Sequence, residues 1–305
     1  MNRHWVGIDW GTTHRRAWYF VDGELRARRA DDQGVLVAGP HFGASLDALL
    51  RRLEAPAEAT VVMAGMIGSA TGWHEARYLD AGQPLGAWAD HLAPVPGRPG
   101  CFIVPGCRWQ RSDEVDVMRS EETQLLGAWH LDPSDGWYVL PGTHSKWVAL
   151  RSGCVVELRT YMSGELYALL TRHGTLAPLL PREAGGQGPD VPGDSGFEAG
   201  FDAGIQAASA RALSHALFGL RARVVTGMVP REQAPGYLSG LLIGSEWHDV
   251  ARTAALDAPV RIVGTPALAA LHAVCARRLG LRAQVLDTEA VQLAAWRALR
   301  AGAAR

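Results

Sequence analysis

The chain has 305 residues, of which 48% are hydrophobic, so it can bury a sizeable core and has the length of two domains of about 150 residues. Its net charge of −1 gives no sign of the basic excess typical of proteins that bind nucleic acid or anionic membranes. The sequence has no secretion signal and no membrane-spanning run, and its four cysteines lack metal-ligand spacing, so we expect a cytoplasmic protein with free thiols.

The first predicted elements are three strands, at residues 5–9, 14–21 and 25–29. A tight hairpin turn usually has Asn-Gly or Asp-Gly between its strands. The first turn here is instead DWGTT, residues 9–13, with an acid, a glycine and two hydroxyls. This composition indicates a turn that binds a ligand.

A helix at residues 45–53 and a strand from Thr60 follow. The stretch GMIGSATGWHEARY, residues 65–78, has the character of a loop. The pattern becomes helical from Arg119, and Ser120 is a candidate for the side chain that caps that helix.

A second β-rich stretch, WYVLPGTHSKWVALRSGCVVELRTY, covers residues 137–161. The remainder is mainly helical, with a Gly/Pro-rich loop at residues 185–196, a strand at 260–264 and a final helix at 288–299.

The two β-rich stretches repeat one pattern of strand, Gly-Thr, strand, turn glycine and strand. The Gly-Thr pairs begin at Gly11 and Gly142, and the turn glycines are Gly23 and Gly153. Because internal repeats reveal architecture, we expect two similar α/β domains, each with a hairpin turn facing a shared cleft.

A Gly-Thr turn suits phosphate, because glycine lets the backbone N–H groups approach closely and threonine adds a hydroxyl. We expect Gly11, Thr12 and Thr13 in the first turn to bind phosphate groups of a nucleotide. The matching residues of the second turn are Gly142, Thr143, His144 and Ser145. Asp9 would hold Mg²⁺, which takes only one or two protein carboxylates. An ordinary polar turn is the alternative for either hairpin taken alone.

Seven segments together are similar to the 2-dehydro-3-deoxygalactonokinase family, within the superfamily of acetate and sugar kinases, heat-shock chaperones and actin. They are DWGTT at Asp9, VMAGMIGS at Val62, GWHEARY at Gly72, DVMRSEETQ at Asp116, LPGTHSKWV at Leu140, MSGELYALL at Met162 and YLSGLLIGSE at Tyr237. Ser120 and Ser163 depart from the Gly and Thr that the family pattern has in these segments.

The resemblance implies two ribonuclease-H-like domains of the actin-like ATPase and sugar kinase type, with an interdomain cleft that binds ATP and Mg²⁺. We expect an N-terminal domain at residues 1–118 and a C-terminal domain at 119–305, with the final helix, residues 288–301, packing back on the first. The implied reaction is phosphorylation of the 6-hydroxyl of 2-dehydro-3-deoxy-D-galactonate in galactonate degradation. A homodimer is left open.

The resemblance also implies roles for individual residues. Related sugar kinases have their general base just before the helix that precedes the second hairpin, and Glu121 matches that position best, with Glu122 next. Acids also favour this first helical turn because of the helix dipole, whatever the function. The segment at Gly264 and Thr265 resembles the adenosine-binding segment, although an ordinary βα unit has the same pattern.

The keto-acid substrate needs a cation for its carboxylate, and arginine binds carboxylates bidentately. Arg77 is the first candidate, with Arg108 and Arg16 as alternatives. The other residues expected at the substrate are Trp73, Glu75 and Glu165.

Lys146 is the only lysine among the 30 basic residues. This suggests that the position needs an ammonium, which as a compact charge suits a γ-phosphate oxygen, and makes Lys146 a candidate catalytic residue. A lysine spared by chance is the alternative.

Two other functions are weighed against this one. The first is a kinase of the same fold that acts on another sugar or 2-keto-3-deoxy sugar acid. The second is a nucleotide-gated binding protein, as in the chaperone and actin branches of the superfamily.

Overall fold

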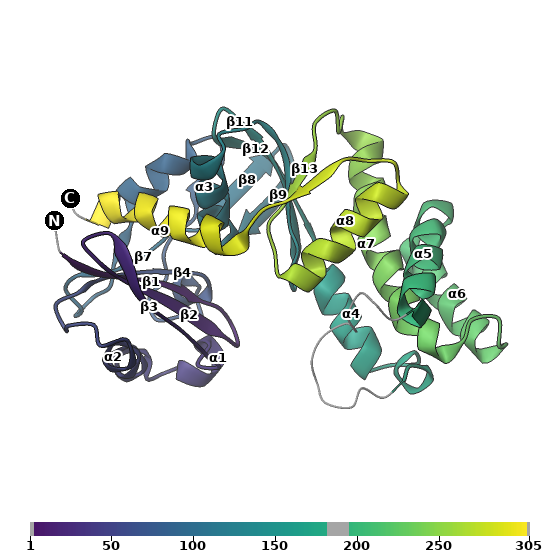
Figure 1. Cartoon of the computed structure of the whole chain (residues 1–305), viewed down its shortest axis with the longest axis horizontal. Helices are drawn as coiled ribbons and strands as arrows, with labels where there is room; N and C mark the ends of the chain where they lie inside the picture. Colours follow the sequence, from purple (N-terminus) through teal and green to yellow (C-terminus); the bar gives the residue numbers. More distant parts are fainter. Residues whose placement is uncertain (1–2, 182–194, 304–305) are drawn as a thin grey trace. The chain divides into compact units, whose positions relative to one another are not determined.

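The computed structural model describes residues 3–181 and 195–303 (Figure 1). By its internal contacts the chain divides into two compact units. The first consists of Met1–Asp135, Val148–Leu158 and Asp287–Arg305, and the second of Gly136–Trp147 and Arg159–Leu286. The first unit thus extends past the domain boundary predicted after residue 118 and includes the final helix. The predicted domain organisation itself stays a prediction, because compact units are not a test of independent folding.

A six-stranded sheet with strand order β3-β2-β1-β4-β7-β6 forms the centre of the first unit. Strands β1 and β2 pair antiparallel, as do β2 and β3, whereas β1, β4 and β7 run parallel. The strands are β1 (His4–Trp10), β2 (Arg15–Val21), β3 (Glu24–Asp31), β4 (Thr60–Ala64), β6 (Ala93–Pro94) and β7 (Cys101–Ile103). The predicted first three strands and the strand from Thr60 are confirmed.

Successive side chains of β1 point to opposite faces of the sheet, and a different helix packs on each face. Val6, Ile8 and Trp10 belong to the hydrophobic core that includes Leu46 and Leu49 of helix α2 (Phe42–Leu53). This helix begins three residues before the predicted start at residue 45.

The opposite face of β1 packs against helix α9 (Thr288–Ala303), the yellow helix of Figure 1. A Cβ atom at Gly7 would lie 2.5 Å from the ring of Trp296, so β1 needs a glycine there to let the indole approach. Trp5 and Trp18 also contact this indole, with ring centroids 6.4 Å and 5.8 Å away. The predicted final helix is therefore present and covers the first sheet.

The remaining elements of the first unit surround this sheet. A three-stranded sheet has the order β5-β8-β9, and helix α3 packs beside α9. The bounds are α1 (Val35–Ala38), η1 (Met66–Gly68), β5 (Leu79–Asp80), η2 (Leu85–His91), β8 (Cys107–Arg111), β9 (Glu114–Met118) and α3 (Glu121–Leu131). Apart from the single turn η1, the predicted loop at residues 65–78 has no helix or strand.

A second sheet has the order β12-β11-β10-β13-β14, in which β10, β13 and β14 run parallel. Its strands are β10 (Gly136–Leu140), β11 (Ser145–Arg151), β12 (Cys154–Tyr161), β13 (Val260–Ile262) and β14 (Ala283–Val285). In both sheets the third, second and first strands of a β-rich stretch lie side by side, and two parallel strands follow. The corresponding order in the first sheet is β3-β2-β1-β4-β7. The repeat predicted from the sequence is thus a repeat of sheet topology.

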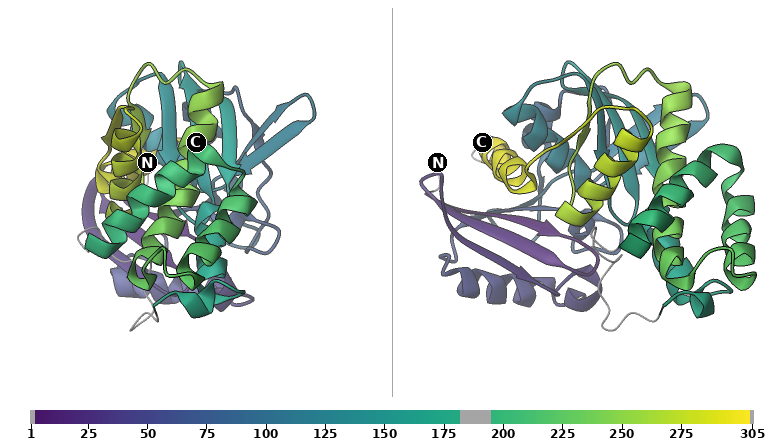
Figure 2. Two further views of the ribbon diagram at one scale, coloured as in Figure 1. Left: turned by 90° about the vertical axis from the view of Figure 1, so that its right-hand side faces the viewer. Right: turned by 45° about the vertical axis from the view of Figure 1, so that its right-hand side comes forward.

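Helices make up the rest of the second unit. They are α4 (Ser163–Arg172), η3 (Ala177–Leu179), α5 (Ser195–Ala210), α6 (Leu213–Val225), η4 (Arg231–Gln233), α7 (Ala234–Thr253) and α8 (Pro266–Arg278). Helices α5 and α7 pack closely side by side, as both views of Figure 2 show. Added Cβ atoms at Gly204 and Gly240 would lie 2.2 Å and 2.1 Å from carbonyl oxygens of the facing helix, so small residues allow this approach.

Two further predictions concern a membrane-spanning helix and the Gly/Pro-rich loop. No helix within residues 3–181 and 195–303 has the length and apolar character to cross a bilayer. The predicted Gly/Pro-rich loop at residues 185–196 lies outside the described residues except for its last two, which begin α5.

Candidate functional site

The first hairpin turn joins β1 to β2 and presents its two threonines to solvent. The Gly11 N–H donates to the His14 carbonyl at 3.0 Å and closes the turn. The carbonyls of Thr12 and Thr13 accept from Leu36 and Gly34 at 3.1 Å, so the start of α1 fixes the turn from one side. Both threonine side chains are exposed. The turn can therefore offer hydroxyls to a ligand without rearranging its backbone.

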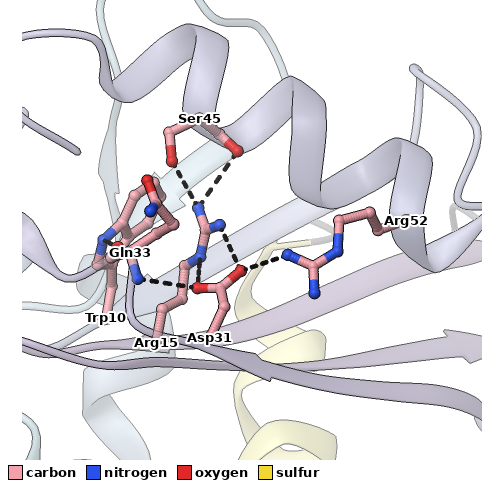
Figure 3. A network of polar contacts seen from close by, with 6 residues as sticks. All are labelled: Trp10, Arg15, Asp31, Gln33, Ser45 and Arg52. Carbon is pink, nitrogen blue, oxygen red and sulfur yellow. Dashed lines mark hydrogen bonds and ion pairs between the residues drawn. The ribbon is translucent and has the colours of Figure 1, made fainter. Parts of the chain in front are cut away.

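A buried ion pair anchors the strand that leaves this turn (Figure 3). Arg15, only 2% exposed, donates from Nε and Nη2 to the two carboxylate oxygens of Asp31 at 3.1 and 2.9 Å. Its Nη1 donates to the hydroxyl of Ser45 in α2, and Arg52 also donates to Asp31. Burial alone would raise the pKa of Asp31, but these cationic donors outweigh it and lower the pKa. The hairpin is thus tied to α2 through charged hydrogen bonds.

Asp9 lies on the opposite face of β1, where both of its carboxylate oxygens accept hydrogen bonds. Arg16, its direct partner in the β1–β2 register, donates from Nη2 to Oδ2 at 2.5 Å. The Ser120 hydroxyl, from the residue before α3, donates to Oδ1 at 2.9 Å. The Asp9 side chain is 12% exposed. A carboxylate held in this way has a defined orientation before any ligand binds.

The start of α3 corrects one prediction. Ser120 immediately precedes the helix, but its hydroxyl makes no capping bond, because that hydroxyl donates to Asp9 instead. The capping is reversed: the Ser120 N–H donates to Glu122 Oε1 and Oε2 at 3.0 and 2.9 Å. The Arg119 N–H donates to Glu121 Oε2 at 3.0 Å. The two candidate bases therefore bind backbone N–H groups at the beginning of their own helix.

Glu121 and Glu122 differ in their access to solvent. Glu122 is 1% exposed, whereas Glu121 is partly exposed. Burial, and next the neighbouring charge of Glu121, raise the pKa of Glu122 to about 8. Access to a substrate hydroxyl thus favours Glu121.

Replacing Glu122 with Gln should change how stability depends on pH. The pKa of Glu122 is raised from 4.5 to about 8 in the folded protein. Between these two pH values the folded protein keeps a proton that the unfolded chain releases. The contribution of Glu122 to the free energy of unfolding therefore falls as pH rises from about 4.5 to 8. Gln resembles the protonated acid and does not titrate, so the variant does not lose this stability as pH rises. In thermal melts we expect the Tm of Glu122→Gln, minus the wild-type Tm, to increase as pH rises from 5.5 to 8.5.

Glu114→Gln is the matched control, because it removes a carboxylate from the exposed strand β9 and reports the effect of net charge alone. A Tm difference between wild type and Glu122→Gln that stays constant across this pH range, after the control is subtracted, contradicts the raised pKa.

The second hairpin turn is fixed by helix α4. The Glu165 N–H donates to the Thr143 carbonyl at 2.9 Å, and the Glu165 carboxylate pairs with His144 Nε2 at 2.6 Å. A Cβ atom at Gly164 would lie 2.2 Å from the Gly142 carbonyl oxygen, so only glycine permits this approach. The structure thus brings Glu165, predicted at the substrate, to the second hairpin turn.

A buried glutamate that sequence reasoning missed anchors the strand after this turn. Glu246 of α7 accepts at Oε2 from the Ser145 hydroxyl and from the Trp147 indole N–H, each at 2.8 Å. The Ser163 hydroxyl also binds it. Burial raises the pKa of Glu246 to about 7 despite these donors. An acid in the otherwise apolar run YLSGLLIGSE was the available signal, because acids are rarely buried without partners.

Lys146 lies on the face of β11 opposite to Ser145 and Trp147. Its side chain is 6% exposed, and Nζ donates to the hydroxyl of Thr160 in β12 at 2.9 Å. Lys146 is therefore buried rather than exposed, and its catalytic role stays a prediction.

The predicted substrate loop and its arginines are spread over the first unit. Trp73 stacks on Phe42, with 6.2 Å between ring centroids. Glu75 and Arg77 are exposed. The two alternative binders of the substrate carboxylate already have acidic partners. Arg108 pairs with Asp80, and Arg16 pairs with Asp9. The substrate site stays a prediction.

The predicted adenosine segment lies beside the second hairpin. A Cβ atom at Gly264 would lie 2.8 Å from Cγ of Pro141, the residue before the Gly-Thr turn. Thr265 is exposed and directly precedes α8. The second unit therefore brings Gly264 close to the turn predicted to bind phosphate.

The model of the 2-keto-3-deoxy-galactonokinase family matches residues 9–299. This range includes both hairpin turns, Glu121, Glu122 and Glu246. The chain belongs to this family. A 2-dehydro-3-deoxygalactonokinase of Escherichia coli strain K12 is 36% identical over 246 residues, which are 81% of this chain and 80% of that protein.

Solved structures agree with membership of the 2-keto-3-deoxy-galactonokinase family. A Sinorhizobium meliloti protein whose crystal structure is named for 2-dehydro-3-deoxygalactonokinase superposes with a TM-score of 0.85 at 31% identity, covering 98% of this chain and 95% of that one. Component A of (R)-2-hydroxyglutaryl-CoA dehydratase from Acidaminococcus fermentans superposes with a TM-score of 0.55 at 12% identity over the full length of both chains. The predicted mixed α/β fold of the actin-like ATPase and sugar kinase type is confirmed.

Proposed function

We propose that the chain transfers the γ-phosphoryl group of ATP to the 6-hydroxyl of 2-dehydro-3-deoxy-D-galactonate, forming the 6-phosphate during galactonate degradation. The observation that carries this proposal is the family match over residues 9–299, which contains both Gly-Thr turns. The name of the Escherichia coli relative supports the choice of sugar acid. The reaction belongs in the cytoplasm, where ATP is made.

The two Gly-Thr turns are proposed to bind the phosphate groups of ATP. Thr12, Thr13 and Thr143 are exposed, and each turn is fixed from behind by other backbone groups. Such a turn binds phosphate without paying for its own ordering. Lys146 is proposed to neutralise charge on the transferred group, since it lies three residues after Thr143 at the start of β11 and carries a compact ammonium. Gly264 and Thr265 are proposed to contact the adenosine.

Asp9 fits the magnesium site that this reaction requires. No set of three His, Cys, Asp or Glu side chains within the described residues could hold a metal. Mg²⁺, however, needs only one or two protein carboxylates when phosphates and water supply its other ligands. When bound, Mg²⁺ would neutralise phosphate charge during transfer. Asp9 would hold it with an oriented, partly exposed carboxylate.

Glu121 is proposed as the general base. A base must lie within hydrogen-bond reach of the substrate hydroxyl, and the buried Glu122 has no solvent-facing surface to offer. Glu121 is partly exposed and begins α3, directly after the residue that binds Asp9. Ser120 thus lies next to the candidate base in the chain and binds the candidate metal ligand.

Arg77 remains the proposed binder of the substrate carboxylate, with Trp73 and Glu75 in the same loop. Its guanidinium is exposed, and arginine offers a carboxylate two parallel hydrogen bonds. Arg16 and Arg108 would first have to release Asp9 and Asp80.

A coupled kinase assay over a panel of 3-deoxy-2-keto acids and sugars tests the proposed function. We expect ADP release that depends on the acceptor, with the highest kcat/KM for 2-dehydro-3-deoxy-D-galactonate. A higher kcat/KM for another sugar or sugar acid would favour the same-fold kinase with a different substrate. ADP release that no acceptor stimulates would favour a nucleotide-gated binding protein.

A further inference from the structure

We propose that Ser120 is a positioning residue that holds the Asp9 carboxylate in an orientation suited to Mg²⁺, and that its strained backbone makes this hydrogen bond possible. The proposal rests on the proposed function, in which Asp9 is the metal ligand. It adds a residue that acts on the metal through another side chain.

The backbone of Ser120 is the first observation. Its φ of +100° with ψ of −39° lies outside the regions that residues with a Cβ atom normally adopt. Such a conformation costs free energy and persists only where the surroundings impose it. Ser112 and Ser152, the other serines with positive φ, have values near the left-handed helical region, at +54° and +51°. Ser120 is therefore the most unusual serine of the described chain.

The hydrogen bond made possible by this backbone is the second observation. The Ser120 hydroxyl donates to Asp9 Oδ1 at 2.9 Å, although the two residues are 111 positions apart. Arg16 binds the other oxygen, Oδ2, from Nη2 and Nε at 2.5 and 3.2 Å. The two groups therefore pull on different oxygens. Without the hydroxyl, Oδ1 is free to turn toward the guanidinium, and Mg²⁺ must then compete with Arg16 for both oxygens.

The attachment of Ser120 to its own helix makes the bond directional. The Ser120 N–H donates to both oxygens of Glu122, and the Ser120 carbonyl accepts from the Thr123 N–H at 3.1 Å. With its N–H and carbonyl both bound to α3, the residue has a fixed backbone. The hydroxyl then holds Asp9 at a constant distance from the start of α3, where Glu121 lies.

Two substitutions separate the hydroxyl from the strain. Ser120→Ala removes the hydroxyl and keeps the Cβ atom that makes the backbone unfavourable, whereas Ser120→Gly removes both. We expect the Tm of the ligand-free protein to fall in Ser120→Ala, and to equal or exceed the wild-type Tm in Ser120→Gly. Ser112→Gly, in the exposed turn between β8 and β9, is the matched control for adding a glycine at a positive φ.

Magnesium binding is measured by thermal shift, as the Mg²⁺ concentration that gives half of the Tm increase produced by Mg²⁺ at a fixed ADP concentration. We expect this concentration to rise about three- to tenfold in both Ser120 variants and to stay at the wild-type value in Ser112→Gly. The Tm of the ligand-free protein and the Mg²⁺ requirement thus report two separate effects.

Two results would overturn the proposal and can be told apart. If both Ser120 variants keep the wild-type Mg²⁺ requirement while Mg²⁺ still raises the wild-type Tm, the positioning role is wrong and the proposed function is unaffected. If Mg²⁺ with ADP fails to raise the wild-type Tm at all, the proposed nucleotide site fails and the positioning role fails with it.

Discussion

Asp9→Asn should lower kcat at saturating Mg²⁺ by at least about 10²-fold, with little change in Tm. The neutral amide is a poor ligand for Mg²⁺, and it leaves the Arg16 cation without its acidic partner beside the phosphates. The fold should tolerate the change, because Asn is nearly isosteric and the Arg16 side chain, 43% exposed, can turn to water. Steady-state kinetics over a range of Mg²⁺ concentrations, with a thermal melt, measure both effects.

Asp22→Asn is the matched control for this prediction. Asp22 also lies in a hairpin turn and also pairs with an arginine, Arg3, at 2.7 Å, but that turn contains neither Gly-Thr pair. Asn tolerates the positive φ of +53° at this position. Near-normal turnover of Asp9→Asn at saturating Mg²⁺ would show that Asp9 is not the metal ligand.

Glu121→Gln should lower kcat by about 10²- to 10⁴-fold, the range expected for loss of a general base. Gln can still accept the hydrogen bond from the Arg119 N–H, so the start of α3 should keep its structure. The affinity for nucleotide should change much less than kcat, because the base acts on the acceptor hydroxyl. Rapid kinetics and ADP titration separate these effects.

Glu122→Gln provides the comparison at the neighbouring position. Its carboxyl is buried and binds the Ser120 N–H, so this variant should affect stability more than the chemical step. A loss of kcat in correctly folded Glu122→Gln that exceeds the loss in Glu121→Gln would assign the base to Glu122.

Local sequence patterns were sufficient for the strands and for the repeat. Alternating apolar residues and turn glycines predicted β1, β2 and β3, and the same pattern predicted β10, β11 and β12. These predictions succeed because each depends on neighbours in the chain and on the turns at Gly23 and Gly153. The order of the parallel strands follows from packing over longer distances, and no local pattern predicted it.

The contacts that hold the candidate site could not be predicted in the same way. Glu246 meets Ser145 across 101 positions, and Ser120 meets Asp9 across 111. No local pattern records such a pairing. The prediction that Ser120 caps α3 failed for this reason: the preference of serine for the position before a helix is a local rule, and a distant carboxylate competed for the hydroxyl.

The roles of individual residues stay predictions after the structure is known. Thr12 and Thr143 lie on exposed turns and Gly264 lies beside Pro141, which is compatible with nucleotide binding. The arrangement around Arg77 gives less guidance, because an exposed loop arginine has the same appearance with or without a substrate role.

The position of Trp296 in helix α9 has a consequence for biosynthesis. Its indole fills the space above Gly7 and touches Trp5 and Trp18, so a helix translated long after β1 and β2 covers this face of both strands. Until residues 288–303 have been made, Trp5 and Trp18 lack this indole, although Phe20 stacks on Trp5 with ring centroids 5.9 Å apart. This face of the sheet therefore stays incompletely covered until α9 is made, and transiently exposed aromatic surface of this kind favours aggregation.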